Sequence, residues 1–138
     1  WMVLFVAAFE AVATDAVEFD YMMNCQGCHL PDGAGFPAHN VPAVAGNLGN
    51  FLGVDGGREF LVQVPGSAQS DLDDARLAAV LNWMLVSFSA EQLPADWQHY
   101  TAAEVHELRK TPLIEVTPLR AALMDLIEVI QQSGGAGR

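Results

Sequence analysis

The two cysteines of this 138-residue chain, Cys25 and Cys28, are separated by only two residues, and His29 follows them directly. Both are used in one short motif, so none remains for a disulfide-rich framework. A Cys-x-x-Cys pair is typical of three kinds of site: a redox dithiol, half of a zinc site, or a haem attachment. The adjacent histidine favours the third. Two thiols at this spacing can add to the two vinyl groups of haem while the imidazole reaches the iron.

The other two kinds of site fit the remaining sequence less well. A structural zinc site needs four protein ligands, and the other histidines, His39, His99 and His106, are not spaced as a second ligand pair. A thioredoxin-like dithiol is expected beside a β-α-β pattern, and no strand pattern is evident here. We therefore expect one covalently attached haem c, with His29 as the proximal iron ligand and its second ring nitrogen held by an acceptor.

Composition limits the class of protein further. The length suits one domain, and 51% hydrophobic against 17% charged residues supplies a core, which argues against disorder. Six Lys and Arg against 17 Asp and Glu give a net charge of −11, which repels nucleic acid. The same acidity would steer a redox partner with a basic docking surface, and Asp71, Asp73, Asp74 and Glu104 are candidates for the acidic patch.

Hydrophobic spacing predicts an all-α fold. The stretch from Leu30 to Gly57 is rich in proline and glycine yet too apolar for a solvent loop, so we expect it to wrap around the haem. Ser70 is a candidate N-cap for the strongest helix, and Thr101 opens a capping box with Glu104. Helices are expected over residues 15–24, 58–64, 70–88, 101–110 and from 117 onward.

The ends of the chain differ from its middle. Residues 1–9 are apolar and are followed by Ala11-Val-Ala13, a pattern similar to a signal-peptidase site, which suggests a periplasmic or otherwise exported protein. This run is too short to span a bilayer, but it is a candidate point of membrane or subunit association. The expected organisation is an anchor, signal remnant or docking segment (1–14), a haem domain (15–90), a C-terminal helical extension (91–132) and a flexible tail (133–138).

The segment from Tyr21 to Gly35 resembles the haem-binding segment of class I cytochromes c, the single-haem electron carriers, and the resemblance covers residues 15–88. It implies a cytochrome c-like helical fold around one covalently attached haem. It also implies a role for Pro42, whose carbonyl would accept a hydrogen bond from the proximal histidine. Trp83 corresponds to the aromatic residue where the last core helix crosses the first.

The sequence departs from this family at the sixth iron ligand, which is usually a methionine in the loop before the last core helix. Here that loop, residues 65–70, contains no methionine, and Gln69 stands at the matching place. The nearest thioether is Met84, which corresponds to a residue that lines the haem pocket in the family. Met84 is therefore the leading candidate. Gln69, one of the three other histidines, water or an open site remain as alternatives.

These features predict an electron carrier rather than an enzyme, because the sequence has no Ser-His-Asp set, paired carboxylates or phosphate-binding loop. The carrier could serve as a subunit of a larger respiratory or dehydrogenase assembly. The alternative is a haem-based module that binds carbon monoxide or nitric oxide at an open sixth position. The identity of the sixth ligand separates the two.

Overall fold

The computed structural model describes the backbone of residues 7–135 and the side chains of residues 16–134. Helices dominate the described part, which confirms the all-α prediction; the extended pairing there is one isolated bridge between Phe36 and Val41. The elements are α1 (Ala7–Asn24), α2 (Gln26–His29), η1 (Pro37–His39), η2 (Leu48–Gly53), α3 (Gly57–Gln63), α4 (Pro65–Ala68), α5 (Asp74–Ser89), η3 (Ala90–Gln92), α6 (Ala102–Leu108) and α7 (Val116–Gly135).

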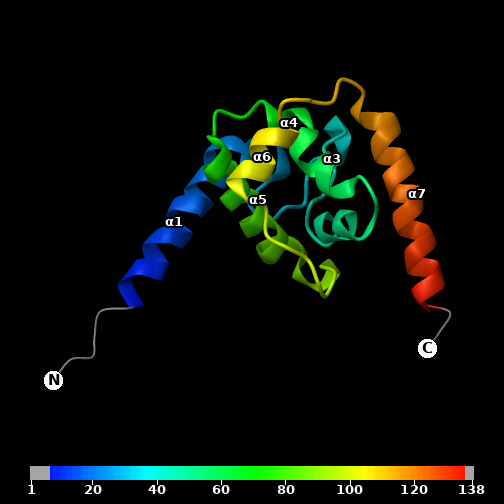
Figure 1. The fold of residues 1–138 in the computed structure, drawn as a ribbon, viewed down its shortest axis with the longest axis horizontal. Coiled ribbons are helices and arrows are strands. Elements are labelled where there is room, and N and C mark those ends of the chain that lie inside the picture. The colour runs from blue at the N-terminus through cyan, green and yellow to red at the C-terminus, as the bar shows by residue number, and fades with distance from the viewer. Residues whose placement is uncertain (1–6, 136–138) are drawn as a thin grey trace.

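Helix α5 forms the centre of the fold and packs against α1 on one side and α6 on the other (Figure 1). Aromatic rings fill the contact between α1 and α5. The ring centroid of Tyr21 lies 5.1 Å from that of Trp83 and 5.3 Å from that of Phe88. Trp83 thus lies where the sequence analysis expected an aromatic residue between the two helices. The contact holds the end of α1, and the motif that follows it, against the core.

The C-terminal helices share the core of the preceding residues. Tyr100 and Val105 are buried against the rest of the core, and so are Leu123 and Ile127 of α7. Helix α7 packs on η2, and in Figure 1 it flanks the body on the side opposite α1. The segment that we treated as an extension therefore packs on the core formed by the preceding residues.

Three helix limits differ from the prediction. Helix α1 begins at Ala7 instead of residue 15, because the alanine-rich stretch that precedes residue 15 favours helix formation. The N-cap of α5 is Asp73, whose carboxylate accepts a hydrogen bond from the Arg76 amide at 2.8 Å, whereas the Ser70 hydroxyl donates to the carbonyl of Ser67. The predicted tail from residue 133 is helical up to Gly135.

Within the described part of the chain, no helix has both the length and the apolar character needed to cross a bilayer. Residues 1–6, which hold most of the apolar run, lie outside the described residues, as do residues 136–138 of the predicted tail.

Candidate functional site

The Cys-x-x-Cys-His motif forms one helical turn at the end of α1. The amide of Cys25 donates to the Tyr21 carbonyl at 2.8 Å, and the amide of His29 donates to the Cys25 carbonyl at 3.0 Å. The Tyr21 hydroxyl donates to the carbonyl of Leu30 at 2.6 Å, which ties the residue after the motif back to α1. Neither thiol is in a disulfide, and the motif forms a hydrogen-bonded turn.

Both cysteines and His29 line one cavity of about 880 Å³. This volume is typical of a pocket that holds a large organic ligand. The remaining walls are mostly apolar and come from the loop after the motif, α3, α5 and the start of α7. They include Val44, Leu48, Phe51, Phe60, Leu61, Leu77, Val80, Leu81 and Met84. The predicted wrapping loop therefore does surround a space, and that space is suited to a flat apolar group.

The imidazole of His29 lies close to the backbone of Pro42. Its Nδ1 atom is buried and has no hydrogen-bond partner of normal geometry among the described residues. Burial lowers the pKa of His29, while the nearby backbone carbonyl of Pro42 raises it in partial opposition. The carbonyl is thus close enough to act on the ring, although the contact stops short of a well-formed hydrogen bond. An imidazole with Nδ1 turned toward a carbonyl keeps Nε2 available for a metal.

Gly35 makes this approach feasible. Its φ is +70°, a left-handed conformation that favours glycine, and a Cβ atom there would lie 2.5 Å from both the carbonyl carbon and the oxygen of Pro42. The amide of Gly35 also donates to the carbonyl of His29 at 3.1 Å. The glycine therefore brings the backbone of Pro42 beside the motif histidine.

The two competing kinds of site find little support around the motif. Burial raises the pKa of the Cys25 thiol to about 11, opposite to the low pKa of a reactive redox dithiol. Among residues 16–134, no group of three or more His, Cys, Asp or Glu side chains could hold a metal ion. The pair of cysteines there has no neighbouring ligands that would complete a zinc site.

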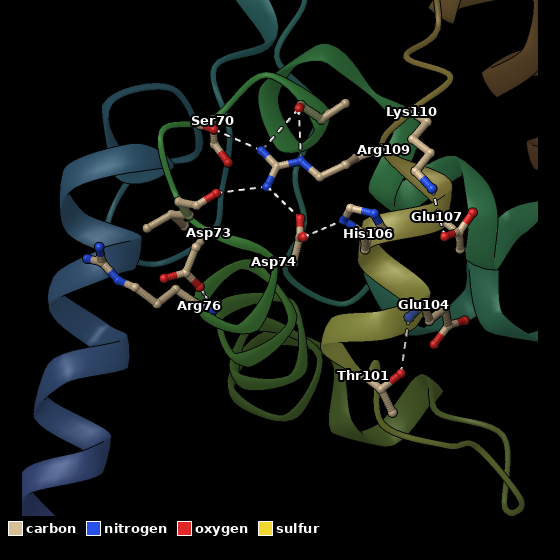
Figure 2. Close-up of polar contacts among 12 residues, drawn as sticks. Ser70, Asp73, Asp74, Arg76, Thr101, Glu104, His106, Glu107, Arg109 and Lys110 are labelled. Atoms are coloured by element: carbon tan, nitrogen blue, oxygen red, sulfur yellow. Dashed lines mark hydrogen bonds and ion pairs between the residues drawn. The ribbon is translucent and has the colours of Figure 1, made fainter.

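The candidates for the sixth ligand are separated clearly in space. Met84 is only 5% exposed and lines the cavity. Gln69 is exposed and is not part of the cavity wall. The other three histidines are also exposed and outside the wall: His39 stacks on Phe36, His99 stacks on Trp97, and His106 Nδ1 lies 2.8 Å from Asp74 Oδ2 (Figure 2).

Pro42 and Trp83, which the sequence analysis expected near the cofactor, lie in different places relative to the cavity. Pro42 belongs to the cavity wall, as expected. Trp83 is not among the lining residues; its ring contacts Tyr21 and Phe88 between α1 and α5. Trp83 therefore packs α1 against α5, and its contact with a bound haem stays a prediction.

Helix α7 contributes a wall that the sequence analysis did not anticipate. Val116, Thr117, Arg120 and Ala121 line the cavity, although they lie outside the haem domain expected over residues 15–90. Their spacing of i, i+1, i+4 and i+5 places them on one face of the helix. This helical periodicity is visible in the sequence, but it does not identify the part of the protein that this face of α7 contacts.

Comparison with known proteins gives two relatives, both called cytochrome c-552. The first, from Thermus thermophilus, is 31% identical over 107 residues, which cover 64% of this chain and 81% of the relative. The second, from an individual strain of the same species, is also 31% identical over 107 residues, which cover 64% of this chain and 72% of the relative. No protein-family model matches the chain.

Proposed function

Because this chain belongs to the c-type cytochromes, which carry electrons on a covalently attached haem c, we propose that Cys25, Cys28 and His29 hold its single haem. The thioether links would come from the two cysteines, and His29 would be the proximal ligand. The observation that supports this most is the convergence on one apolar cavity of both thiols and an imidazole whose buried Nδ1 is unpartnered near Pro42.

The residues of the cavity have definite tasks in this proposal. When bound, the haem supplies a one-electron couple between ferric and ferrous iron. The apolar side chains of α3 and α5 exclude water from its faces, which fixes the polarity around the couple. His29 is held by the helical turn of the motif and by the approach of Pro42. The side chains therefore need to move little when an electron arrives or leaves, which suits outer-sphere transfer.

Met84 is the proposed sixth ligand. It is buried in the cavity wall on α5, whereas Gln69, His39, His99 and His106 are exposed and lie outside that wall. A thioether ligand stabilises ferrous haem and raises the reduction potential. Methionine ligation favours an electron carrier over the alternative of a carbon monoxide or nitric oxide sensor, because both axial positions are then filled by the chain.

The proposed partner is a redox protein with a basic docking surface, supported by the net charge of −11. Two of the four acidic residues suggested for the patch are already paired inside this chain: Asp74 with Arg109 and His106, and Glu104 with Arg58. The steering would therefore come from the overall charge more than from these two side chains. Its signature is an electron-transfer rate with a basic partner that falls as ionic strength rises.

The proposal includes export and, as an extension, a place in a larger redox assembly. Thioether attachment outside the cytoplasm and the apolar start of the sequence support export.

Exposed apolar side chains on α7, among them Leu126, Val129 and Ile130, support a contact with another subunit. Size-exclusion chromatography of the purified protein tests the assembly: a monomer at micromolar concentration would count against it.

The experiment that tests the proposed function is expression with the c-type cytochrome maturation system, followed by mass spectrometry under denaturing conditions. We expect one haem to remain bound to the unfolded chain, and a peptide map to locate it on residues 25–29. A variant with Cys25→Ala and Cys28→Ala should lose the covalent haem. A colourless wild-type protein, or intact protein with both thiols free, would refute the proposal.

A further inference from the structure

We infer that Arg120, on α7, binds a propionate carboxylate of the haem and thereby helps to set the reduction potential. The inference rests on the proposed function, because it concerns the same cavity, but it gives a role to the C-terminal helix that haem attachment alone does not.

The position of α7 is determined by its own core contacts. Leu123 and Ile127 are buried, at 3% and 5% exposure, where the helix packs on η2. These two residues hold one face of α7 against the core. Val116 and Arg120 lie on the preceding turns of the same face, and they line the cavity. Arg120 is half-buried and belongs to the cavity wall. This is the environment in which an arginine meets a carboxylate at the edge of an otherwise apolar ligand.

The distribution of positive charge singles out Arg120. The chain has six Lys and Arg residues, and the sixth, Arg138, lies outside the described residues. Of the other five, Arg58, Arg76, Arg109 and Lys110 each form an ion pair with a carboxylate of the chain. Within residues 16–134, Arg120 has neither an ion pair nor a side-chain hydrogen bond. Although the chain has a net charge of −11, no carboxylate of residues 16–134 pairs with the guanidinium of Arg120, and Arg120 lines the cavity.

The chemistry of the cavity wall requires such a group. Haem carries two propionate carboxylates, and no Asp or Glu side chain of the described residues lines the cavity. In the same part of the chain, Arg120 is the one arginine or lysine of the wall, and it is joined by neutral donors such as Asn47, Ser67 and Thr117. A partly buried carboxylate without a cation would be costly, and the planar guanidinium can meet it with two hydrogen bonds.

The two ends of the haem also fit the two sides of the protein. The vinyl and propionate groups lie on opposite edges of the porphyrin. The cysteines that would take the vinyl edge follow α1, and Arg120 comes from α7, which flanks the body on the other side (Figure 1). An arginine that neutralises a propionate adds positive charge near the iron, which favours the ferrous state and raises the potential.

The test compares Arg120→Gln with Lys110→Gln in the purified holoprotein. Both substitutions remove one positive charge, but Lys110 lies outside the cavity and pairs only with the exposed Glu107. We expect Arg120→Gln to lower the midpoint potential clearly more than Lys110→Gln does. We also expect it to shift the propionate-bending band in the resonance Raman spectrum, which Lys110→Gln should leave in place. Arg120→Lys, which retains the charge but not the fork of donors, should restore most of the potential and only part of the band position.

Equal potentials in the two glutamine variants, with an unmoved propionate band, would overturn the inference. A band that shifts equally in both variants would do the same, since a general charge effect would then explain it. Failure of the proposed function looks different: wild-type protein would then lack covalent haem, whereas all three variants here are expected to carry it in full.

Discussion

Nη1 of Arg109 lies 3.1 Å from Oδ1 of Asp74, and this ion pair joins α6 to the first residue of α5 (Figure 2). The same guanidinium donates to the backbone carbonyls of Ala68, Ser70 and Leu72 at 2.8 to 3.2 Å. The side chain of Arg109 thus supplies hydrogen-bond donors to the backbone carbonyls of the turn between α4 and α5. That turn is where the family usually places its methionine ligand. Here an arginine holds the turn, and the turn contains no methionine.

Removing Arg109 should therefore destabilise the protein strongly. In Arg109→Gln, three carbonyls lose their donor and Asp74 loses one of its two side-chain partners, and Arg109 is only 18% exposed. We expect a loss of about 3 kcal/mol in the free energy of unfolding, measured by guanidinium denaturation of the holoprotein. Lys110→Gln, one residue along and exposed, should cost less than about 0.5 kcal/mol. Similar losses in the two variants would contradict the role of Arg109.

The second prediction concerns acid stability and the pair of Arg58 with Glu104. Arg58 Nη2 lies 2.8 Å from Glu104 Oε2, and hydrogen bonds from Arg58 lower the pKa of Glu104 below its ordinary 4.5. A lowered pKa in the folded state means that the unfolded chain binds the proton first as the pH falls. The pair therefore contributes its full stability above about pH 4.5 and loses it as the pH falls through the lower, folded-state value.

Glu104→Gln should remove this dependence. The variant should be less stable than wild type at pH 7, and the difference should shrink as the pH falls below about 4.5, as followed by thermal unfolding monitored by circular dichroism. Glu107→Gln is the matched control, because the exposed Glu107 pairs only with Lys110 in solvent. A difference that stays constant with pH would show that Glu104 acts by packing alone.

The third prediction tests the approach of Pro42 to His29. In Gly35→Ala, the new Cβ would meet the Pro42 carbonyl at 2.5 Å and the residue would keep a φ of +70°. We expect a loss of about 2 kcal/mol or more in stability and a changed reduction potential, because the acceptor beside His29 moves away. Gly46→Ala is the control: φ is +68° there, but a Cβ would meet nothing within 4 Å, so only about 1 kcal/mol of backbone strain should appear.

The features that depend on adjacent residues were the ones that the sequence could predict. The motif needs only Cys25, Cys28 and His29, and the capping box at Thr101 is confirmed by its 3.2 Å hydrogen bond from the Glu104 amide. The prediction of Ser70 as the N-cap of α5 was wrong, since several side chains able to cap a helix follow one another there and Asp73 caps it. Which of these side chains caps the helix depends on where the turn before α5 ends.

Contacts between distant parts of the chain were harder to predict. The face of α7 that lines the cavity is recognisable as a helix face, but amphipathic spacing does not identify its partner. The exposed position of Gln69 likewise depends on how Arg109 holds the turn before α5. These outcomes come from tertiary packing, which the pattern of a single helix does not contain.

The last prediction concerns Met84 as the sixth ligand. Met84→Leu conserves side-chain volume and should cost less than about 1.5 kcal/mol in stability, so the holoprotein remains available for study. If the thioether binds the iron, the variant loses the near-infrared band of ferric sulfur ligation, its midpoint potential falls, and its ferrous form binds carbon monoxide at once. Met22→Leu, which changes an exposed methionine outside the cavity, should alter none of these. Wild-type protein that lacks the band and binds carbon monoxide as fast as Met84→Leu would instead establish an open sixth position, and the sensor alternative would take the place of the carrier.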